Sequence, residues 1–395
     1  MRTKEKGRTQ KGERMGPLRG LRVVEMAGIG PGPFAGMLLA DLGADVLRVE
    51  RPAPPTPIIG DPRFDLLNRG KRSVVLDLKS PVGVEAALKL CGEAEVLIEG
   101  FRPGVMERLS LGPDRCLEKN PRLVYGRITG FGQTGPLASA AGHDLNYIAL
   151  AGALHAIGGP DAPAIPLNLI GDFGGGGMLL AFGVLCALLE ARASGKGQVV
   201  DAAMIDGVSA LLTPLFGLMA MGLWRDRRAS NLLDGASPFY AVYQTSDGKW
   251  ITLAPLEPQF HGELIERLGL DPEEFAPRFD RDQWPRLKEK LAALVRTRTR
   301  DEWCALLEGS DVCFAPVLSL LEAPEHPQLK ERRTYVTVAG VRQAAPAPRF
   351  SRTPGEIRGP ALPPGKGGAE ALRAWGFSAE EIERLREAGA LAIDP

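Results

Sequence analysis

The residues best suited to proton chemistry lie in one stretch of the chain, between positions 142 and 177. His143 is followed directly by Asp144, and a second carboxylate, Asp172, comes shortly before four consecutive glycines at 174–177. The chain has only four histidines, and an imidazole exchanges protons near neutral pH. Glycines also allow a backbone to approach a ligand closely. We therefore expect an active site here, with a histidine beside a carboxylate as its proton-transfer group.

Each of these residues also has a purely structural interpretation. A lone histidine is more often a structural residue than a catalyst, and Asp172 stands where it can cap the helix predicted to follow it. Capping is compatible with catalysis, because a helix N-terminus also shifts the pKa of a carboxyl group. The glycines after Asp172 would present backbone N–H groups to negative charge on a substrate oxygen. Glu257, just before Pro258, either begins a helix or orients an imidazole.

A second glycine cluster, at 28–32, follows the first predicted strand, and Glu50 ends the second predicted strand. A Rossmann fold places its phosphate turn and its ribose-binding acid at these two points. A nicotinamide dinucleotide site is therefore one hypothesis. However, Pro33 stands where the GxGxxG pattern requires its last glycine. A tight turn that admits another ligand or another backbone is the favoured interpretation.

Cationic residues recur where predicted strands end. Any one of them is best interpreted as solvated surface charge. Together they lie at the mouths of successive strands, where open α/β sheets bind ligands, and their chemistry suits the phosphates of a nucleotide-like group. They are Arg51, the run Asn-Arg-Gly-Lys-Arg at 68–72, Lys79, Arg102 and Arg108.

The composition is typical of a soluble globular protein with more than one domain. The chain has 395 residues, with 48 Lys and Arg balanced by 48 Asp and Glu. This balance gives no reason to expect nucleic acid or an anionic membrane as a general partner. Two long uncharged runs, 173–189 and 207–224, contain five glycines and Pro214 respectively. We interpret both runs as buried core helices rather than membrane spans.

The cysteines and the N-terminal residues indicate in which cellular compartment the protein is expected. Five cysteines are scattered along the chain without the spacing of metal ligands, so neither a disulfide framework nor a zinc site is favoured. A reducing cytoplasm fits best. Residues 1–14 carry several basic side chains and no apolar stretch, so we do not interpret them as a secretory signal.

Strand and helix patterns alternate at the spacing of βαβ units in the first half of the chain. This alternation predicts an α/β fold with a parallel, Rossmann-like sheet covered by helices. After about residue 235 a hairpin pattern over 238–253 precedes three helical patterns, at 259–268, 284–295 and 300–307, which predicts a smaller α+β domain. In the first half, the predicted strands are 21–26, 45–50, 73–78, 95–98, 123–128 and 198–203, and the predicted helices are 33–42, 81–91, 177–193 and 205–221.

These patterns divide the chain into five expected segments. They are a disordered extension at 1–15, a large Rossmann-like domain at 16–204, a linker helix at 205–234, a small α+β domain at 235–330, and a return segment at 331–395 that completes the large domain.

Seven motifs resemble those of one known group of enzymes. Residues 21–34, 42–52, 101–104 and 195–202 resemble the class III CoA-transferase (CaiB/BaiF) superfamily. Three further motifs resemble its α-methylacyl-CoA racemase branch: GHDLNY at 142–147, NLIGDFGGG at 168–176 and EPQF at 257–260. The match covers residues 16–355, and the proline-rich C-terminus is not diagnostic.

The resemblance implies 1,1-proton transfer at the carbon beside the carbonyl of a CoA thioester. His143 and Asp172 match the two acid/base residues of that branch. Glu257 matches a residue that pairs with the histidine and comes from the partner subunit of an interlocked homodimer. The implied substrate is an acyl-CoA, and we expect no metal and no cofactor beyond that CoA. The implied CoA contacts are Arg51, Leu76, Asp77, Leu78, Lys79, Gly100, Phe101, Arg102, Arg108, Gly142, Asp144, Leu145, Asn146 and Tyr147.

A CoA-transferase of the same fold is the main alternative. In such an enzyme the residue matching Asp172 is a nucleophile that forms mixed anhydride and thioester intermediates. Transferases typically lack the histidine and the Glu-Pro-Gln-Phe motif, so His143 and Glu257 favour the racemase. A nicotinamide oxidoreductase and a catalytically silent CoA-binding protein are further alternatives. The sequence does not indicate which acyl chain the substrate carries.

Overall fold

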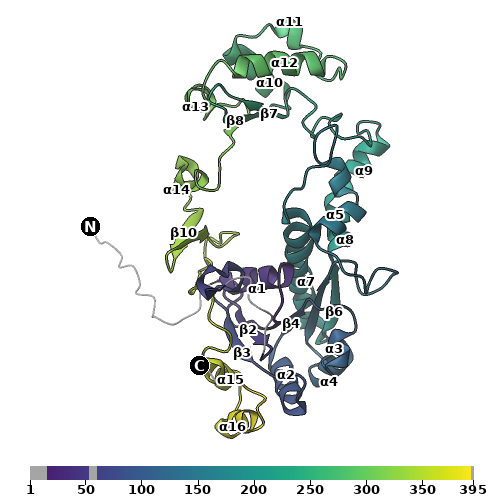
Figure 1. Cartoon of the computed structure of the whole chain (residues 1–395), viewed down its shortest axis with the longest axis vertical. Coiled ribbons are helices and arrows are strands. Elements are labelled where there is room, and N and C mark those ends of the chain that lie inside the picture. The colour runs from purple at the N-terminus through teal and green to yellow at the C-terminus, as the bar shows by residue number, and fades with distance from the viewer. Residues whose placement is uncertain (1–15, 53–59, 393–395) are drawn as a thin grey trace, which may run out of the picture. The chain divides into compact units, whose positions relative to one another are not determined.

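The computed structural model describes residues 16–52 and 60–392, so the expected extension at 1–15 lies outside the described residues. The chain forms two compact units (Figure 1). Unit 1 contains the described parts of Met1–Tyr147, Asn168–Val208 and Glu331–Pro395, and unit 2 contains Ile148–Leu167 and Ser209–Lys330. The expected linker at 205–234 therefore begins in unit 1 and continues in unit 2.

Unit 1 is built on a six-stranded parallel sheet with the order β3-β2-β1-β4-β5-β6. This is the strand order of a Rossmann fold, so the predicted α/β class and sheet type are confirmed. The order reverses between β1 and β4, which makes the carboxyl ends of these two strands the switch point where open α/β sheets bind ligands. The strands are β1 (Arg22–Met26), β2 (Asp45–Glu50), β3 (Arg72–Val75), β4 (Val96–Glu99), β5 (Val124–Thr129) and β6 (Gln198–Ala203).

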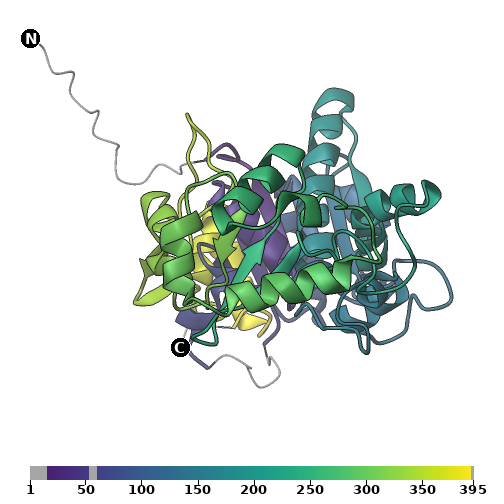
Figure 2. The same cartoon turned by 90° about the horizontal axis from the view of Figure 1, so that it is seen from above.

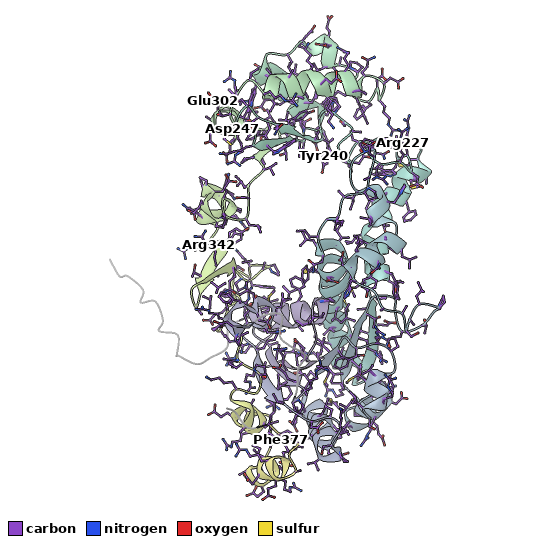
Figure 3. The ribbon with its side chains drawn as sticks, viewed as in Figure 1. Arg227, Tyr240, Asp247, Glu302, Arg342 and Phe377 are labelled. Carbon is purple, nitrogen blue, oxygen red and sulfur yellow. The ribbon has the colours of Figure 1, made fainter. Side chains whose placement is uncertain are left out.

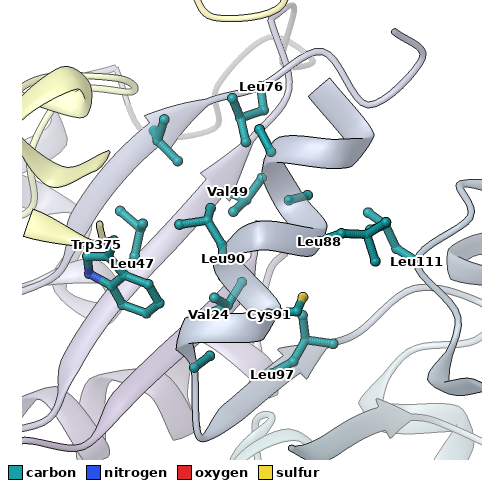
Figure 4. Close-up of a cluster of buried hydrophobic side chains, with 14 of the residues drawn as sticks. Val24, Leu47, Val49, Leu76, Leu88, Leu90, Cys91, Leu97, Leu111 and Trp375 are labelled. Atoms are coloured by element: carbon teal, nitrogen blue, oxygen red, sulfur yellow. The ribbon is translucent and has the colours of Figure 1, made fainter. Parts of the chain in front are cut away.

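Helices cover both faces of this sheet because successive strand residues point to opposite faces. Val24 belongs to a core cluster that includes Leu90 and Trp375 (Figure 4), whereas its neighbour Val23 belongs to a second cluster that includes Leu39. The helices of unit 1 are α1 (Pro31–Asp41), α2 (Pro81–Glu93), α3 (Val105–Arg108), α4 (Pro113–Lys119), α7 (Leu179–Ser194), α15 (Gly368–Ala374) and α16 (Ala379–Glu387), with short turns η1 (Pro62–Phe64) and η2 (Leu66–Asn68). Two further helices, α5 (Asp144–Leu150) and α8 (Met204–Leu211), begin in unit 1 and end in unit 2.

The C-terminal part of the chain completes unit 1. The yellow C-terminal helices lie beside the purple N-terminal strands in both views (Figures 1 and 2), and α15 packs on β3. The expected extended return segment also contains a hairpin, β10 (Tyr335–Val338) and β11 (Val341–Ala344), that the sequence patterns did not predict. The Arg69 guanidinium donates to the carbonyl of Ala344 at 2.8 Å and so connects this hairpin to the N-terminal part of unit 1.

Two members of the cationic run at 68–72 are buried in ion pairs. Arg69 donates to the Asp41 carboxylate at 2.6 Å, and Lys71 donates to the Glu25 carboxylate at 2.7 Å. Burial lowers the pKa of Lys71 to about 8, although Glu25 opposes the shift. For Arg69 and Lys71, the interpretation as surface charge and the interpretation as phosphate-binding groups are therefore both wrong.

The helix that carries Asp172 begins earlier than predicted. A π-helix, η3 (Leu169–Met178), runs directly into α7. Asp172 lies inside η3, so the prediction that it caps this helix is wrong. By length and composition, Leu169–Ser194 is the one helix among the described residues that could cross a membrane. In unit 1, α7 packs on β5 and β6 as a core helix.

The glycines at 174–177 bring backbones into close contact and lie within the helix instead of forming an open loop. A Cβ at Gly175 would lie 2.7 Å from the amide nitrogen of Val208, and one at Gly177 would lie 2.8 Å from the carbonyl oxygen of Pro31. The run therefore lets η3 approach α1 and α8. The expectation that these glycines present free N–H groups to a ligand is wrong.

Unit 2 has its own core around Phe275 and Trp303 and a three-stranded antiparallel sheet in the order β7-β8-β9. The predicted hairpin and the three following helices are confirmed. The predicted helix at 205–221 is instead two helices, α8 and α9, that separate at Leu212. The elements are β7 (Ala241–Gln244), β8 (Trp250–Leu253), β9 (Phe314–Pro316), α6 (Ala153–Ala156), α9 (Thr213–Ala220), α10 (Pro258–Leu268), α11 (Pro272–Phe275), α12 (Trp284–Val295), α13 (Arg300–Leu307), η4 (Ala323–Glu325) and α14 (Pro327–Glu331).

Asp247, in the hairpin turn, and Glu302, in α13, lie close together at one end of unit 2 (Figure 3). Asp247 accepts a hydrogen bond from the backbone of Arg300 at 3.1 Å. Glu302 completes a capping box with Thr299 at the start of α13. The bond between Asp247 and Arg300 joins the hairpin turn to the start of α13.

Candidate active site

The backbone around His143 is held on both sides. His143 directly precedes α5, and its N–H donates to the Asn146 side chain at 3.0 Å. The Tyr147 hydroxyl donates to the carbonyl of Gly142. A Cβ at Gly142 would lie 2.7 Å from the Tyr147 ring, so this turn requires glycine. The His143 side chain is exposed, so its imidazole is open to a ligand while its backbone is fixed.

Asp172 lies in the same unit and is bonded to the residue after His143. Its backbone N–H donates to the Asp144 carboxylate at 2.7 Å. Its own carboxylate accepts a hydrogen bond from the Asn168 amide at 3.1 Å. Asp144 is buried, and its other oxygen has no hydrogen-bond partner among the described residues. The helix that carries Asp172 is thus bonded, through Asp144, to the segment that carries His143.

The surroundings of Asp172 favour its protonated form. Burial raises the pKa of Asp172, and the neighbouring Asp144 carboxylate raises it further. The hydrogen bond from Asn168 and the charge of His143 oppose this rise, but the net shift is upward. Burial also raises the pKa of Tyr147, with an opposing effect from Arg102. Arg102 therefore lies within electrostatic range of this site.

The first glycine cluster borders the Asp172 carboxylate. Gly30 adopts a left-handed conformation with φ of 70° just after β1, and a Cβ on it would lie 3.5 Å from Asp172 Oδ2. The tight turn thus brings backbone close to the predicted acid/base at the switch point of the sheet. Glu50, the acid that a dinucleotide ribose would need, is buried and accepts a hydrogen bond from Ser73 at 2.6 Å. This geometry fits the tight-turn interpretation better than the dinucleotide hypothesis.

The residues predicted to contact CoA lie after successive strands of unit 1. Arg51 follows β2, residues 76–79 follow β3, and residues 100–102 follow β4. They therefore share the carboxyl edge of the sheet. Leu76 departs from the expectation for a contact residue because its side chain is buried in the core and its backbone N–H donates to the carbonyl of Glu50 at 2.8 Å. Asp77 accepts a hydrogen bond from the Lys79 backbone at 3.0 Å.

The remaining predicted contacts flank His143 in the 142–147 segment. The side chains of Leu145 and Asn146 are exposed, whereas those of Asp144 and Tyr147 are buried. Asp144 and Tyr147 thus have positions suited to holding the loop. Arg108, on α3, is exposed.

Glu257 lies in unit 2, whereas His143 and Asp172 lie in unit 1. It stands directly before α10 and its side chain is exposed. Burial lowers the pKa of Arg278, and the charge of Glu257 opposes that shift. The pairing of Glu257 with His143 stays a prediction.

Sequence reasoning assigned no role to Asn168, which bonds the Asp172 carboxylate. The two residues are four positions apart, the spacing that places side chains on one helical face. That spacing, within a motif already singled out, was the available signal. Among the described residues no cluster of three or more His, Cys, Asp or Glu side chains is arranged to hold a metal ion.

Comparison with known proteins assigns the family. The model of CoA-transferase family III matches residues 18–368. The chain belongs to this family. It is 45% identical to the α-methylacyl-CoA racemase of Mus musculus over 373 residues, and 43% identical to that of Homo sapiens over 378 residues. Each of these matches covers 93% of this chain and 96% of the relative.

A solved structure agrees with this assignment. The fold is similar to that of a CaiB/BaiF family protein from Brucella suis, with a TM-score of 0.76 and 30% identity. That match covers 92% of this chain and all of the other.

Proposed function

We propose that this protein is a racemase that inverts the α-carbon of 2-methylacyl-CoA thioesters by 1,1-proton transfer. The names of the mouse and human relatives support this reaction. The observation that carries the proposal is the 2.7 Å hydrogen bond from the Asp172 backbone to Asp144. It joins the segment that carries the imidazole to the helix that carries the second carboxylate. In this proposal one site contains two groups that exchange a proton with the same carbon.

The reaction needs two groups whose protonation states alternate. Removal of the α-proton beside a thioester carbonyl gives a planar enolate, and a proton returned to the opposite face inverts the carbon. In one direction a neutral His143 removes the proton and a protonated Asp172 supplies one. In the other direction the Asp172 carboxylate removes the proton and the His143 imidazolium supplies one. The raised pKa of Asp172 suits a carboxyl group that must carry a proton in one of its resting forms.

The proposal extends to the CoA part of the substrate, to Glu257 and to a homodimeric assembly. CoA enters as part of the substrate, with the basic residues at the carboxyl edge of the sheet available for its phosphates. Glu257 of the partner subunit would orient the His143 imidazole, in a homodimer with shared sites. Large exposed apolar side chains support a subunit interface: Phe182 in α7 is 65% exposed and Phe216 in α9 is 62% exposed. We assign the protein to the cytoplasm, in keeping with five unpaired cysteines.

A CoA-transferase is the alternative that the family name itself supports. In that reaction the Asp172 carboxylate attacks the thioester carbonyl and releases CoA as thiolate, leaving a mixed anhydride. CoA then attacks the anhydride, an acyl carboxylate leaves, and the enzyme-bound thioester passes CoA to an acceptor acid.

One incubation separates the two reactions. Enantiopure 2-methylacyl-CoA is incubated with the enzyme in D2O, with and without an added carboxylic acid as CoA acceptor. We expect deuterium at the α-carbon and loss of optical purity, both independent of the acceptor. Transfer of CoA to the acceptor without α-exchange would overturn the racemase assignment.

A further inference from the structure

The loop that follows β4 and the short helix α3, residues 100–108, together carry four of the predicted CoA contacts, and one arginine bonds acids near both ends of this segment. We propose that Arg127, on β5, is a positioning residue that clamps Glu99 and Glu107 and thereby presents Arg102 and Arg108 to the phosphates of the CoA moiety. This inference rests on the proposed function, because it takes CoA as part of the substrate. It assigns a role to three charged residues outside the acid/base pair.

The contacts of Arg127 define the clamp. Its Nε donates to Glu99 Oε1 at 2.7 Å, at the end of β4. Its Nη1 and Nη2 donate to the two Glu107 oxygens at 2.8 Å and 3.3 Å, on α3. The second Glu99 oxygen accepts a hydrogen bond from the backbone of Phe101 at 2.7 Å, inside the loop. One guanidinium therefore bonds Glu99, directly before the 100–108 segment, and Glu107, directly before Arg108 at its end.

Burial makes this clamp rigid. Glu99 is 1% exposed and Arg127 is 6% exposed. Burial raises the pKa of Glu99, and the bonds from Phe101 and Arg127 oppose that rise. A buried charge without its partner is costly. Loss of the contact with Arg127 would therefore leave the buried Glu99 carboxylate strongly destabilised. The Glu107 side chain is half-exposed and forms the outer end of the clamp.

The loop itself is folded so that its two arginines share one turn. The backbone of Val105 donates to the carbonyl of Arg102 at 3.1 Å. Gly104 is left-handed, with φ of 81°, and a Cβ on it would lie 3.2 Å from Arg108 Nη1. The Arg108 guanidinium thus folds back over the turn that follows Arg102.

Both loop arginines remain available to a ligand. Arg102 and Arg108 are exposed, and within residues 16–52 and 60–392 neither forms an ion pair with an acidic side chain. Free guanidinium groups on a fixed turn are suited to phosphate, which they bind through two parallel hydrogen bonds. The clamp thus orients the loop while its own charges are satisfied internally.

The test uses the full-length enzyme and the outer acid, because Glu107→Gln leaves the buried Glu99–Arg127 pair intact. CoA affinity is measured by calorimetry, and kcat and KM are measured with an acyl-CoA and with the matching S-acyl pantetheine, which lacks the nucleotide. We expect E107Q to weaken CoA binding about tenfold, the scale of one charge-assisted hydrogen bond. KM for the acyl-CoA rises in proportion, and kcat and all pantetheine values stay unchanged. Arg127→Lys, which keeps the charge but loses the two-pronged geometry, should act in the same direction.

The matched control is Glu85→Gln, which breaks an exposed ion pair with Arg115 (2.8 Å) between α2 and α4 of the same unit. We expect the CoA affinity, kcat and KM of E85Q to equal those of the wild-type enzyme. Unchanged CoA affinity in E107Q, or equal losses with acyl-CoA and acyl pantetheine, would overturn the clamp. Wild-type enzyme that binds CoA but does not racemise would contradict the proposed function alone, because the affinity measurement requires no turnover.

Discussion

Asp172 has two polar neighbours with opposite effects on its charge. The Asn168 amide donates to its carboxylate and stabilises the ionised form, whereas the Asp144 carboxylate disfavours that form. Burial acts in the same direction as Asp144. The protonation of this group is therefore adjustable at two sites that are separate from the proposed acid/base pair.

We predict that Asn168→Ala moves the pH profile of racemisation to higher pH. Loss of the donated hydrogen bond raises the pKa of Asp172 further, so a higher pH is needed before the carboxylate acts as a base. The measurement is the acidic limb of kcat/KM for the enantiomer that Asp172 deprotonates. A limb that stays in place, or moves to lower pH, would contradict this assignment.

Asp144→Asn is the matched variant, for which we expect the pH profile to shift in the opposite direction. The amide oxygen can still accept the hydrogen bond from the Asp172 backbone, but the neighbouring negative charge is gone. We expect the pKa of Asp172 to fall and the same limb to move to lower pH. If both variants shifted the limb in one direction, general disruption of the site would be the better explanation.

At the residue scale the sequence predicted the proposed acid/base pair, and it misjudged two buried charges. His143 and Asp172 stand out because, among only four histidines, His143 lies beside a carboxylate and near the run of four glycines that follows Asp172. Arg69 and Lys71 looked like surface or phosphate-binding charges, whereas each is paired inside unit 1. The partner of Lys71, Glu25, is 46 positions away in the chain. Spacing along a sequence does not reveal such long-range pairing.

At the scale of elements, the helix that carries Asp172 shows what side-chain patterns leave out. The sequence predicted β2, β6, α12 and α13 with the observed bounds. It did not predict η3, because an apolar, glycine-rich run has the same composition in an α-helix and a π-helix. The difference lies in backbone hydrogen bonds, and π-helical turns often occur at functional sites. Contact of η3 with α1 and α8 is a tertiary property that local propensity does not encode.

We predict that Gly207→Ala destabilises the protein by about 1–3 kcal/mol, the usual cost of overpacking. A Cβ at this position of α8 would lie 1.8 Å from the carbonyl oxygen of Gly175 in η3. The control is Gly262→Ala in α10, where a Cβ would meet nothing within 4 Å. That change should stabilise by up to about 1 kcal/mol through helix propensity. Denaturant unfolding measures both, and a stable G207A would contradict the close contact of η3 with α8.

At the scale of the whole molecule, the proposed site takes its acid/base pair from one subunit and Glu257 from the partner subunit. His143 and Asp172 belong to unit 1, and Glu257 belongs to unit 2. Sequence patterns predicted the fold class of each unit. They did not predict that residues 148–167 would group with unit 2, because such grouping depends on long-range contacts.

Mixed dimers test the proposed sharing of sites between subunits. We predict that Asp172→Asn and Glu257→Gln chains are each impaired alone and that heterodimers of the two regain activity. If Glu257 comes from the partner subunit, one of the two sites in such a heterodimer contains every wild-type group. Differently tagged chains, purified together, allow the measurement. Sites built within single chains would leave the heterodimer as impaired as its parents.

The central claim is that His143 and Asp172 act on opposite faces of one α-carbon, and α-proton exchange in single-base variants tests it most directly. Purified His143→Gln and Asp172→Asn are each incubated in D2O with each enantiomer of a 2-methylacyl-CoA. The account predicts that neither variant racemises, and that each retains exchange with one enantiomer only, the two variants acting on opposite enantiomers. Racemisation by either variant, or exchange of the same enantiomer by both, would contradict it.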